Sequence, residues 1–142
     1  MGAVATGDPV RMANPAIRAL LVDDNLEFLE AMADFLSGRP GLELLGWTIS
    51  AAEAVDIVRH VDVDVVLIDV AMPGMNGLEA TRRIKDRAAP PKVVMLTFHD
   101  GREYRDAARA AGADAFVPKS DMGSRLLPVL DLLFDKGRDA AS

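Results

Sequence analysis

An aspartate ends an unusually apolar run near the middle of this chain. The residues VDVVLID finish at Asp69, and the loop MPGMNG follows. A strand that is buried on both faces reads as a nearly continuous apolar run, so Asp69 is expected where such a strand gives way to a loop. Open α/β folds place their chemistry there. The carboxylate could act as a nucleophile or a metal ligand, although an isolated aspartate is more often a strand end or a helix cap.

Four further reactive side chains follow apolar runs elsewhere. LLVDD ends in Asp23 and Asp24, VVMLT ends in Thr97, and AFVPK ends in Lys119. Taken singly, each is typical of a helix cap, a strand residue or a surface charge. Together they would suit phosphoryl transfer, in which carboxylates hold a cation, a hydroxyl and an ammonium contact phosphate oxygens, and a carboxylate can be the nucleophile.

The elements that must position these residues can be predicted from apolar spacing. Five strands are expected at 16–24, 42–48, 63–69, 89–97 and 113–119. Five helices are expected at 26–41, 51–61, 78–88, 102–111 and 124–136. Gly38 and Pro40 are expected to end the first of them. This alternation predicts an α/β fold, a doubly wound parallel sheet covered by helices on both faces. The strand ends that lead into helices then share one edge, where all five reactive residues would converge.

The length of 142 residues and the 50% hydrophobic content are typical of a single domain. We expect that domain at 17–136, between a flexible N-terminal tail, 1–16, and a frayed C-terminal tail, 137–142. Pro128 would fall several residues into a last helix that began near Met122, and should kink that helix or move its start later.

Charge and composition exclude several functions. The net charge of -6, without a run of Lys or Arg, disfavours direct nucleic-acid binding by this chain. The absence of cysteine excludes disulfides, zinc-thiolate sites and thiol catalysis, and two histidines are too few for a histidine-rich metal site. No signal peptide and no membrane-length apolar stretch is evident, so we expect a cytoplasmic protein with no membrane contact.

Magnesium is the cofactor that the acidic cluster predicts. Asp23, Asp24 and Asp69 would repel one another at neutral pH unless they share a cation. Mg²⁺ prefers hard oxygen ligands and commonly uses one or two carboxylates plus phosphate oxygens. Asp69 is the best placed nucleophile, because it lies on the central strand between the other acids on one side and Thr97 and Lys119 on the other.

The chain resembles the response-regulator receiver domains of two-component signalling. The motifs LLVDDN, LIDVAMPGMNGLEATRRI, VVMLTFHD and AGADAFVPKS follow that family's pattern in order and spacing from Ile17 to Leu133. MPGMNGLEATRRI and AGADAFVPK are most similar to the NarL/FixJ-like branch. The resemblance implies a flavodoxin-like receiver fold, with strand order 2-1-3-4-5 and five helices. It also implies a phosphoacceptor, not a turnover enzyme, that catalyses its own phosphorylation and dephosphorylates slowly.

The resemblance assigns the phosphoryl group and the metal to particular residues. Asp69 would be the phosphorylation site, with a sensor histidine kinase or phosphotransfer protein as the donor. Asp24 would bind Mg²⁺ directly and Asp23 largely through water. Asp69 and the backbone carbonyl of Ala71 would be further ligands.

Three more residues acquire roles from the same resemblance. Thr97 would bond a phosphoryl oxygen and move toward it on activation, while Lys119 would pair with another oxygen. Phe116 matches the family's switch aromatic, which swings inward as Thr97 moves, although an ordinary strand aromatic fits it as well. His99 is a candidate modulator of phosphoryl lifetime, since it titrates near neutrality. A solvent-exposed loop histidine is the alternative.

We expect one surface of the domain to transmit the signal, and the sequence leaves open whether a further domain receives it. The fourth helix, fifth strand and last helix would change on phosphorylation and serve target binding or dimerisation. Receivers of this branch usually precede a helix-turn-helix domain, yet only nine residues follow Leu133. A stand-alone receiver and a piece of a longer regulator are both consistent with the sequence.

Two other functional classes compete with a phosphoaccepting receiver. A phosphatase of the haloacid-dehalogenase type also uses a strand-end aspartate, magnesium, threonine and lysine. It usually needs a second aspartate two residues after the first, where this chain has Ala71. A degenerate receiver that acts without phosphorylation is disfavoured because all five reactive residues are present.

Overall fold

The computed structural model describes residues 16–72, 74–98 and 102–134, with the side chains of residues 102 and 103 left out. His99 and the terminal residues 1–15 and 135–142 lie outside the described residues. The structure therefore does not test the predictions for His99 and for the two tails.

Five parallel strands form one sheet in the order β2-β1-β3-β4-β5. Their bounds are β1 Ile17–Val22, β2 Leu42–Thr48, β3 Val65–Asp69, β4 Lys92–Thr97 and β5 Ala115–Pro118. The predicted fold class and strand order are confirmed. All the strands point the same way, so their carboxyl ends share one edge of the sheet.

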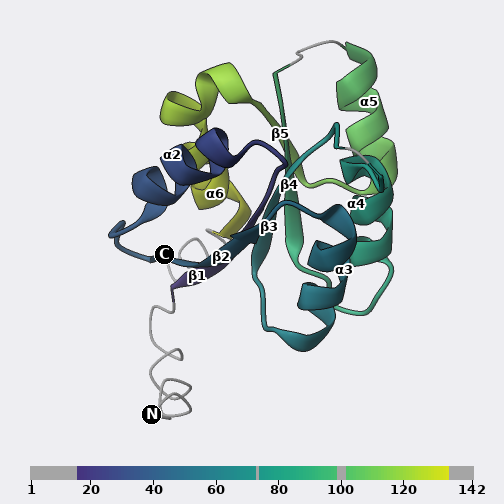
Figure 1. Cartoon of the computed structure of the whole chain (residues 1–142), viewed down its shortest axis with the longest axis horizontal. Helices are drawn as coiled ribbons and strands as arrows, with labels where there is room; N and C mark the ends of the chain where they lie inside the picture. The colour runs from purple at the N-terminus through teal and green to yellow at the C-terminus, as the bar shows by residue number, and fades with distance from the viewer. Residues whose placement is uncertain (1–15, 73, 99–101, 135–142) are drawn as a thin grey trace.

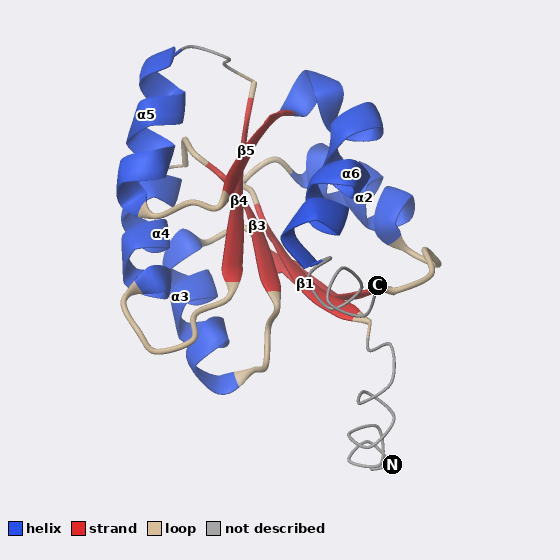
Figure 2. Cartoon of the chain, turned by 180° about the vertical axis from the view of Figure 1, so that it is seen from behind, coloured by secondary structure: helices blue, strands red, loops and turns tan. Residues whose placement is uncertain are grey.

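Five α-helices cover the sheet within the described residues. They are α2 Leu26–Leu36, α3 Ala51–His60, α4 Gly77–Lys85, α5 Arg102–Ala111 and α6 Met122–Phe134, and a 3₁₀ turn, η1 Lys119–Asp121, precedes the last. Figures 1 and 2 show α2 and α6 on one face and α3, α4 and α5 on the other. None of these helices is both long and apolar enough to cross a membrane.

The central strand β3 is buried along its whole length. Val66 and Ile68 pack into the cluster under α3, α4 and α5, whereas Val65 and Leu67 pack into the cluster under α2 and α6. Burying one such aliphatic side chain stabilises a fold by about 1.5–3 kcal/mol. The same alternation places the side chain of Asp69 on the face that α2 and α6 cover.

The helices begin close behind the strand ends because polar caps fix their starts. The side-chain oxygens of Asn25, Ser50 and Asn76 each accept a hydrogen bond from the backbone N–H three residues later, at 2.9–3.0 Å. Such a cap stabilises a helix start by about 1 kcal/mol. These caps fix the points at which the chain behind β1, β2 and β3 enters the next helix.

The last helix differs from its prediction. It begins at Met122, two residues before the expected Ser124, and it continues through Pro128. Pro128 is exposed, so the carbonyl that loses a donor lies on the solvent side, where water can replace the bond. The expectation of a later start is wrong. Strand β5 ends at Pro118, and Lys119 opens the 3₁₀ turn instead of closing the strand.

Candidate functional site

The ends of four strands bring the predicted residues to one edge of the sheet. Asp23 directly follows β1, Asp69 and Thr97 are the last residues of β3 and β4, and Lys119 directly follows β5. In the strand register Asp69 lies beside Leu96, and Thr97 beside Pro118. Residues separated by almost a hundred positions in sequence thus become neighbours.

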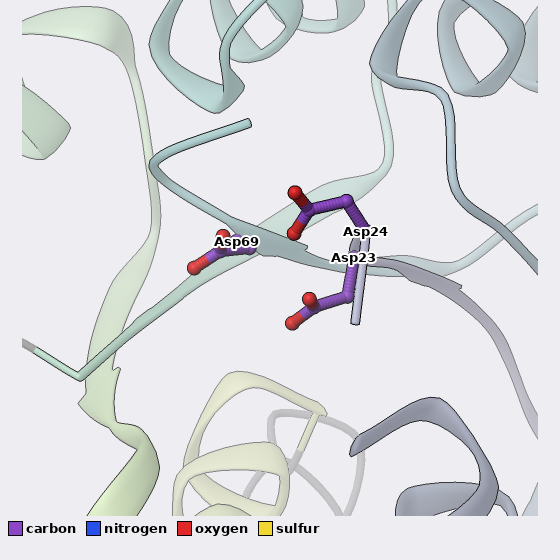
Figure 3. A group of neighbouring side chains, drawn as sticks. All are labelled: Asp23, Asp24 and Asp69. Atoms are coloured by element: carbon purple, nitrogen blue, oxygen red, sulfur yellow. The ribbon is translucent and has the colours of Figure 1, made fainter. Parts of the chain in front are cut away.

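Three carboxylates form the acidic part of the site. One oxygen from each of Asp23, Asp24 and Asp69 lies within 4.8 Å of the other two. Figure 3 shows Asp23 and Asp24 leaving the chain in opposite directions, with both carboxylates turned toward the side on which Asp69 lies. Asp23 and Asp69 are buried, with exposed fractions of 1% and 7%, whereas Asp24 is exposed. The cluster therefore has a buried base and one solvent-facing carboxylate.

Lys119 supplies the positive charge at the base of this cluster. Its Nζ lies 2.6 Å from Asp23 Oδ2 and 3.4 Å from Asp69 Oδ1, and the lysine is itself buried. Asp23 Oδ1 accepts a hydrogen bond from the backbone N–H of Asn25 at 2.9 Å. Asp23 Oδ2 is buried and accepts no hydrogen bond from the described residues, and the Lys119 ammonium lies beside it. A buried charge pair of this kind strongly disfavours loss of either partner.

The environment of Asp69 raises its pKa from 3.8 to about 6. Burial is the main cause, because it removes water from the charged form. The ammonium of Lys119 lowers the pKa, while the negative charges of Asp23 and Asp24 raise it. Asp69 is consequently an ionised but poorly stabilised carboxylate at neutral pH.

The donor set fits a magnesium ion. Three carboxylates supply only hard oxygen ligands, and the exposed Asp24 leaves a side open to water, which Mg²⁺ keeps in its coordination shell. Repulsion among the acids contributes to the raised pKa of Asp69, and an added cation would relieve it. Asp23, Asp24 and Asp69 would hold such an ion. Ala71 lies in the exposed loop two residues beyond Asp69, and its carbonyl remains a predicted ligand.

The first residue of α4 approaches the backbone of Asp69 very closely. A Cβ at Gly77 would lie 2.1 Å from the carbonyl oxygen of Asp69, and the Gly77 N–H donates to Val70 O at 3.0 Å. Gly74, in the loop between β3 and α4, has φ of 76°, a conformation that favours glycine. Glycines in the MPGMNG segment are typical of a turn, but the close approach of Gly77 depends on packing that spacing alone does not reveal.

The two residues predicted to switch lie at neighbouring strands. Thr97 is 1% exposed, and Phe116 is partly buried against the cluster under α3, α4 and α5. The guanidinium of Arg105 in α5 lies 5.3 Å from the centre of the Phe116 ring. The switching roles of Thr97 and Phe116 remain predictions.

Sequence reasoning missed two aromatic residues beside Lys119. Its Nζ lies 4.4 Å from the centre of the Phe28 ring and 4.6 Å from that of Phe98. Phe28 follows Asp24 by four residues and Phe98 directly follows Thr97, so closeness to the motifs was the available signal.

The family follows from a comparison of the whole sequence. Residues 19–131 match the model of the response regulator receiver domain. The chain belongs to this family. Its structural neighbours include receivers of the LuxR and NarL families, in agreement with the predicted branch.

Similar proteins are longer than this chain, and the similarity covers only part of them. This chain is 40% identical over 104 residues to a protein-glutamate methylesterase/protein-glutamine glutaminase of Geobacillus kaustophilus, covering 72% of this chain and 30% of that protein. It is 32% identical over 126 residues to the response regulator UvrY of Escherichia coli, covering 89% and 58%. A LuxR-family response regulator of Aurantimonas sp. SI85-9A1 superimposes with a TM-score of 0.78 at 30% identity, covering 83% and 84%. The chain therefore spans less than two thirds of these two sequence relatives.

Proposed function

We propose that this receiver domain accepts a phosphoryl group on Asp69 from the phosphohistidine of a sensor histidine kinase or phosphotransfer protein. The observation that carries the proposal is the meeting of Asp69 with two further acids and a buried lysine at one sheet edge. Phosphoryl transfer needs little covalent chemistry from a protein beyond positioning and charge neutralisation, and this arrangement provides both.

The transfer itself is a substitution at phosphorus. A carboxylate oxygen of Asp69 forms a bond to phosphorus as the bond from phosphorus to the imidazole nitrogen breaks. The electron pair of that bond returns to the nitrogen, and a proton already on the other ring nitrogen lets the ring leave as neutral histidine. The product is an aspartyl phosphate. A magnesium ion held by Asp23 and Asp24 would supply further neutralisation of charge on the phosphoryl oxygens.

The residues around Asp69 support this step. The Lys119 ammonium is 3.4 Å from Asp69 Oδ1, within reach of an oxygen on a phosphoryl group attached there. The hydroxyl of Thr97, at the end of the adjacent strand, would donate to another phosphoryl oxygen. With a pKa of about 6, Asp69 is mostly ionised above neutral pH, as a nucleophile must be.

The downstream events form the second part of the proposal. Phosphorylation would alter the surface of α5, β5 and α6, which would then bind a target or a second copy of the chain. The contact of Arg105 in α5 with Phe116 in β5 supports coupling between two of these elements. We place this receiver in the cytoplasm, as a signalling phosphoacceptor that does not contact nucleic acid or membrane itself.

Incubation with acetyl phosphate and Mg²⁺ tests the phosphoacceptor role. Intact mass spectrometry should show one added phosphoryl group in the wild type and none in Asp69→Asn. Asp34→Asn, which changes an exposed acid on α2, is the matched control and should be phosphorylated normally. Absence of modification in the wild type would refute the proposal, and rapid turnover of many phosphate esters would favour a phosphatase.

A further inference from the structure

Two aromatic rings lie against the ammonium of Lys119. Phe28 comes from α2, and Phe98 follows β4, so the rings reach Nζ from two different elements. The distances from Nζ to the ring centres are 4.4 Å and 4.6 Å. Both are inside the range of about 6 Å in which a cation is attracted to the face of an aromatic ring. We call Phe28 and Phe98 the aromatic pair.

The aromatic pair completes an enclosure around a flexible side chain. A lysine ammonium is a compact charge on a four-carbon stem, and such a stem adopts many conformations unless its end is held. Here Asp23 lies 2.6 Å from Nζ and Asp69 3.4 Å from it, and the two rings add their attraction. The lysine side chain is only 3% exposed as a result.

Burial does not explain the aromatic character of Phe98. Its exposed fraction is 68%, so it contributes little to the core, and an exposed apolar side chain does not by itself stabilise the fold. The interaction that accounts for an aromatic ring at this position is its contact with the Lys119 ammonium. Phe28, by contrast, also packs against the core cluster under α2 and α6.

We propose that Phe28 and Phe98 are positioning residues for Lys119. The rings hold the ammonium beside Asp69 in the unphosphorylated protein, so that Lys119 need not be ordered anew when a phosphoryl group arrives. The consequence is a faster transfer to Asp69, because less side-chain freedom is lost on reaching the transition state. This consequence rests on the proposed phosphoacceptor function, whereas the placement of the ammonium by the rings does not.

The chain contains a matched control for Phe28. Phe35 lies seven residues later on the same helix and packs against the same core cluster. Its ring centre is also 4.4 Å from a cation, the guanidinium of Arg39. Phe35→Leu therefore removes a ring, a core contact and a cation contact of the same kind without touching Lys119.

The first experiment measures the placement of the ammonium by NMR in the unphosphorylated protein. A ring current shifts protons above the face of an aromatic ring upfield, and the end of Lys119 lies over both rings, so its ε-methylene protons should resonate upfield of those of an ordinary lysine. Phe28→Leu and Phe98→Leu should each move them part of the way back, and Phe35→Leu should leave them unchanged. Unshifted ε-methylene protons in the wild type would overturn the inference, whether or not Asp69 is phosphorylated.

The second experiment measures the rate of phosphorylation by acetyl phosphate with Mg²⁺. Phe28→Leu and Phe98→Leu should each slow the reaction about two- to fivefold, the range expected for one partly exposed cation–π contact. Phe98→Tyr keeps the aromatic face and should restore the wild-type rate, while Phe35→Leu should not alter it. Equal rates for Phe98→Leu and Phe98→Tyr would overturn the positioning role. A wild type that takes up no phosphoryl group would refute the proposed function and the kinetic consequence together, and would leave the NMR result to decide the placement.

Discussion

Replacement of Asp69 with asparagine is expected to stabilise the fold at neutral pH. The carboxylate of Asp69 is buried, and its pKa is about 6 in the folded protein against an ordinary value of 3.8. Asparagine keeps the shape but carries no charge, so it removes the desolvation and the repulsion from Asp23 and Asp24. The difference of about two pKa units corresponds to about 3 kcal/mol in the free energy of unfolding.

The sign and pH window of this effect follow from proton linkage. Between pH 4 and 6 the folded protein binds more protons at Asp69 than the unfolded chain does, so this residue makes stability fall as pH rises. The advantage of Asp69→Asn over the wild type should therefore be about 3 kcal/mol at pH 7.5. It should decrease to about 1.5 kcal/mol at pH 5 and to about 0.5 kcal/mol at pH 4.

Urea denaturation followed by circular dichroism measures this difference. Both proteins are denatured with urea in Mg²⁺-free buffer at each pH. Asp34→Asn, which changes an exposed acid, serves as the control. Added Mg²⁺ should stabilise the wild type more than Asp69→Asn, because a ligand stabilises the state that binds it. The reasoning is refuted if Asp69→Asn is less stable than the wild type at pH 7.5, or if the difference does not depend on pH.

Three further substitutions test local features of the fold. Gly77→Ala should lower stability by about 1–3 kcal/mol and slow phosphorylation, because its Cβ would lie 2.1 Å from the Asp69 carbonyl oxygen; wild-type denaturation and kinetics would contradict this. Thr81→Val should raise stability by about 1 kcal/mol, since the buried Thr81 hydroxyl has no hydrogen-bond partner in the part of the chain that the structure describes; a loss of stability would count against it. Ser50→Ala should lower stability by about 1 kcal/mol with unchanged phosphorylation, because it removes the cap that accepts from the Glu53 N–H; an unaltered urea midpoint would show that this cap is not needed.

Most of the fold can be predicted from the sequence because local pattern and tertiary environment agree. The run before Asp69 is apolar at consecutive positions, and β3 is buried on both faces. The helix expected at 102–111 has the same bounds in the structure as α5. The last helix shows where pattern fails, because Pro128 disfavours a helix locally while packing of its buried face against the sheet maintains one. Because Pro128 is exposed, water can replace the lost hydrogen bond, and the helix loses little stability.

The site was only partly predictable for a related reason. Parallel strands bring their carboxyl ends together whatever the side chains are, so the meeting of Asp23, Asp69 and Lys119 follows from topology. Which carboxylate the lysine approaches more closely depends on side-chain conformations, and the structure favours Asp23. The ring of Phe28 reaches Nζ from a helix, a contact that no strand pattern contains.

The position of Lys119 determines how far the charge of Asp69 is neutralised in the unphosphorylated site. The ammonium lies 0.8 Å closer to Asp23 than to Asp69, as the distances of 2.6 Å and 3.4 Å show. Asp69 is therefore incompletely neutralised, which agrees with its raised pKa. Phosphorylation would move negative charge from the buried carboxylate outward to phosphoryl oxygens, where Lys119 and Thr97 can meet it. The burial that destabilises ionised Asp69 would thus favour its conversion to an acyl phosphate, in which the added negative charge lies on oxygens that Lys119 and Thr97 can contact.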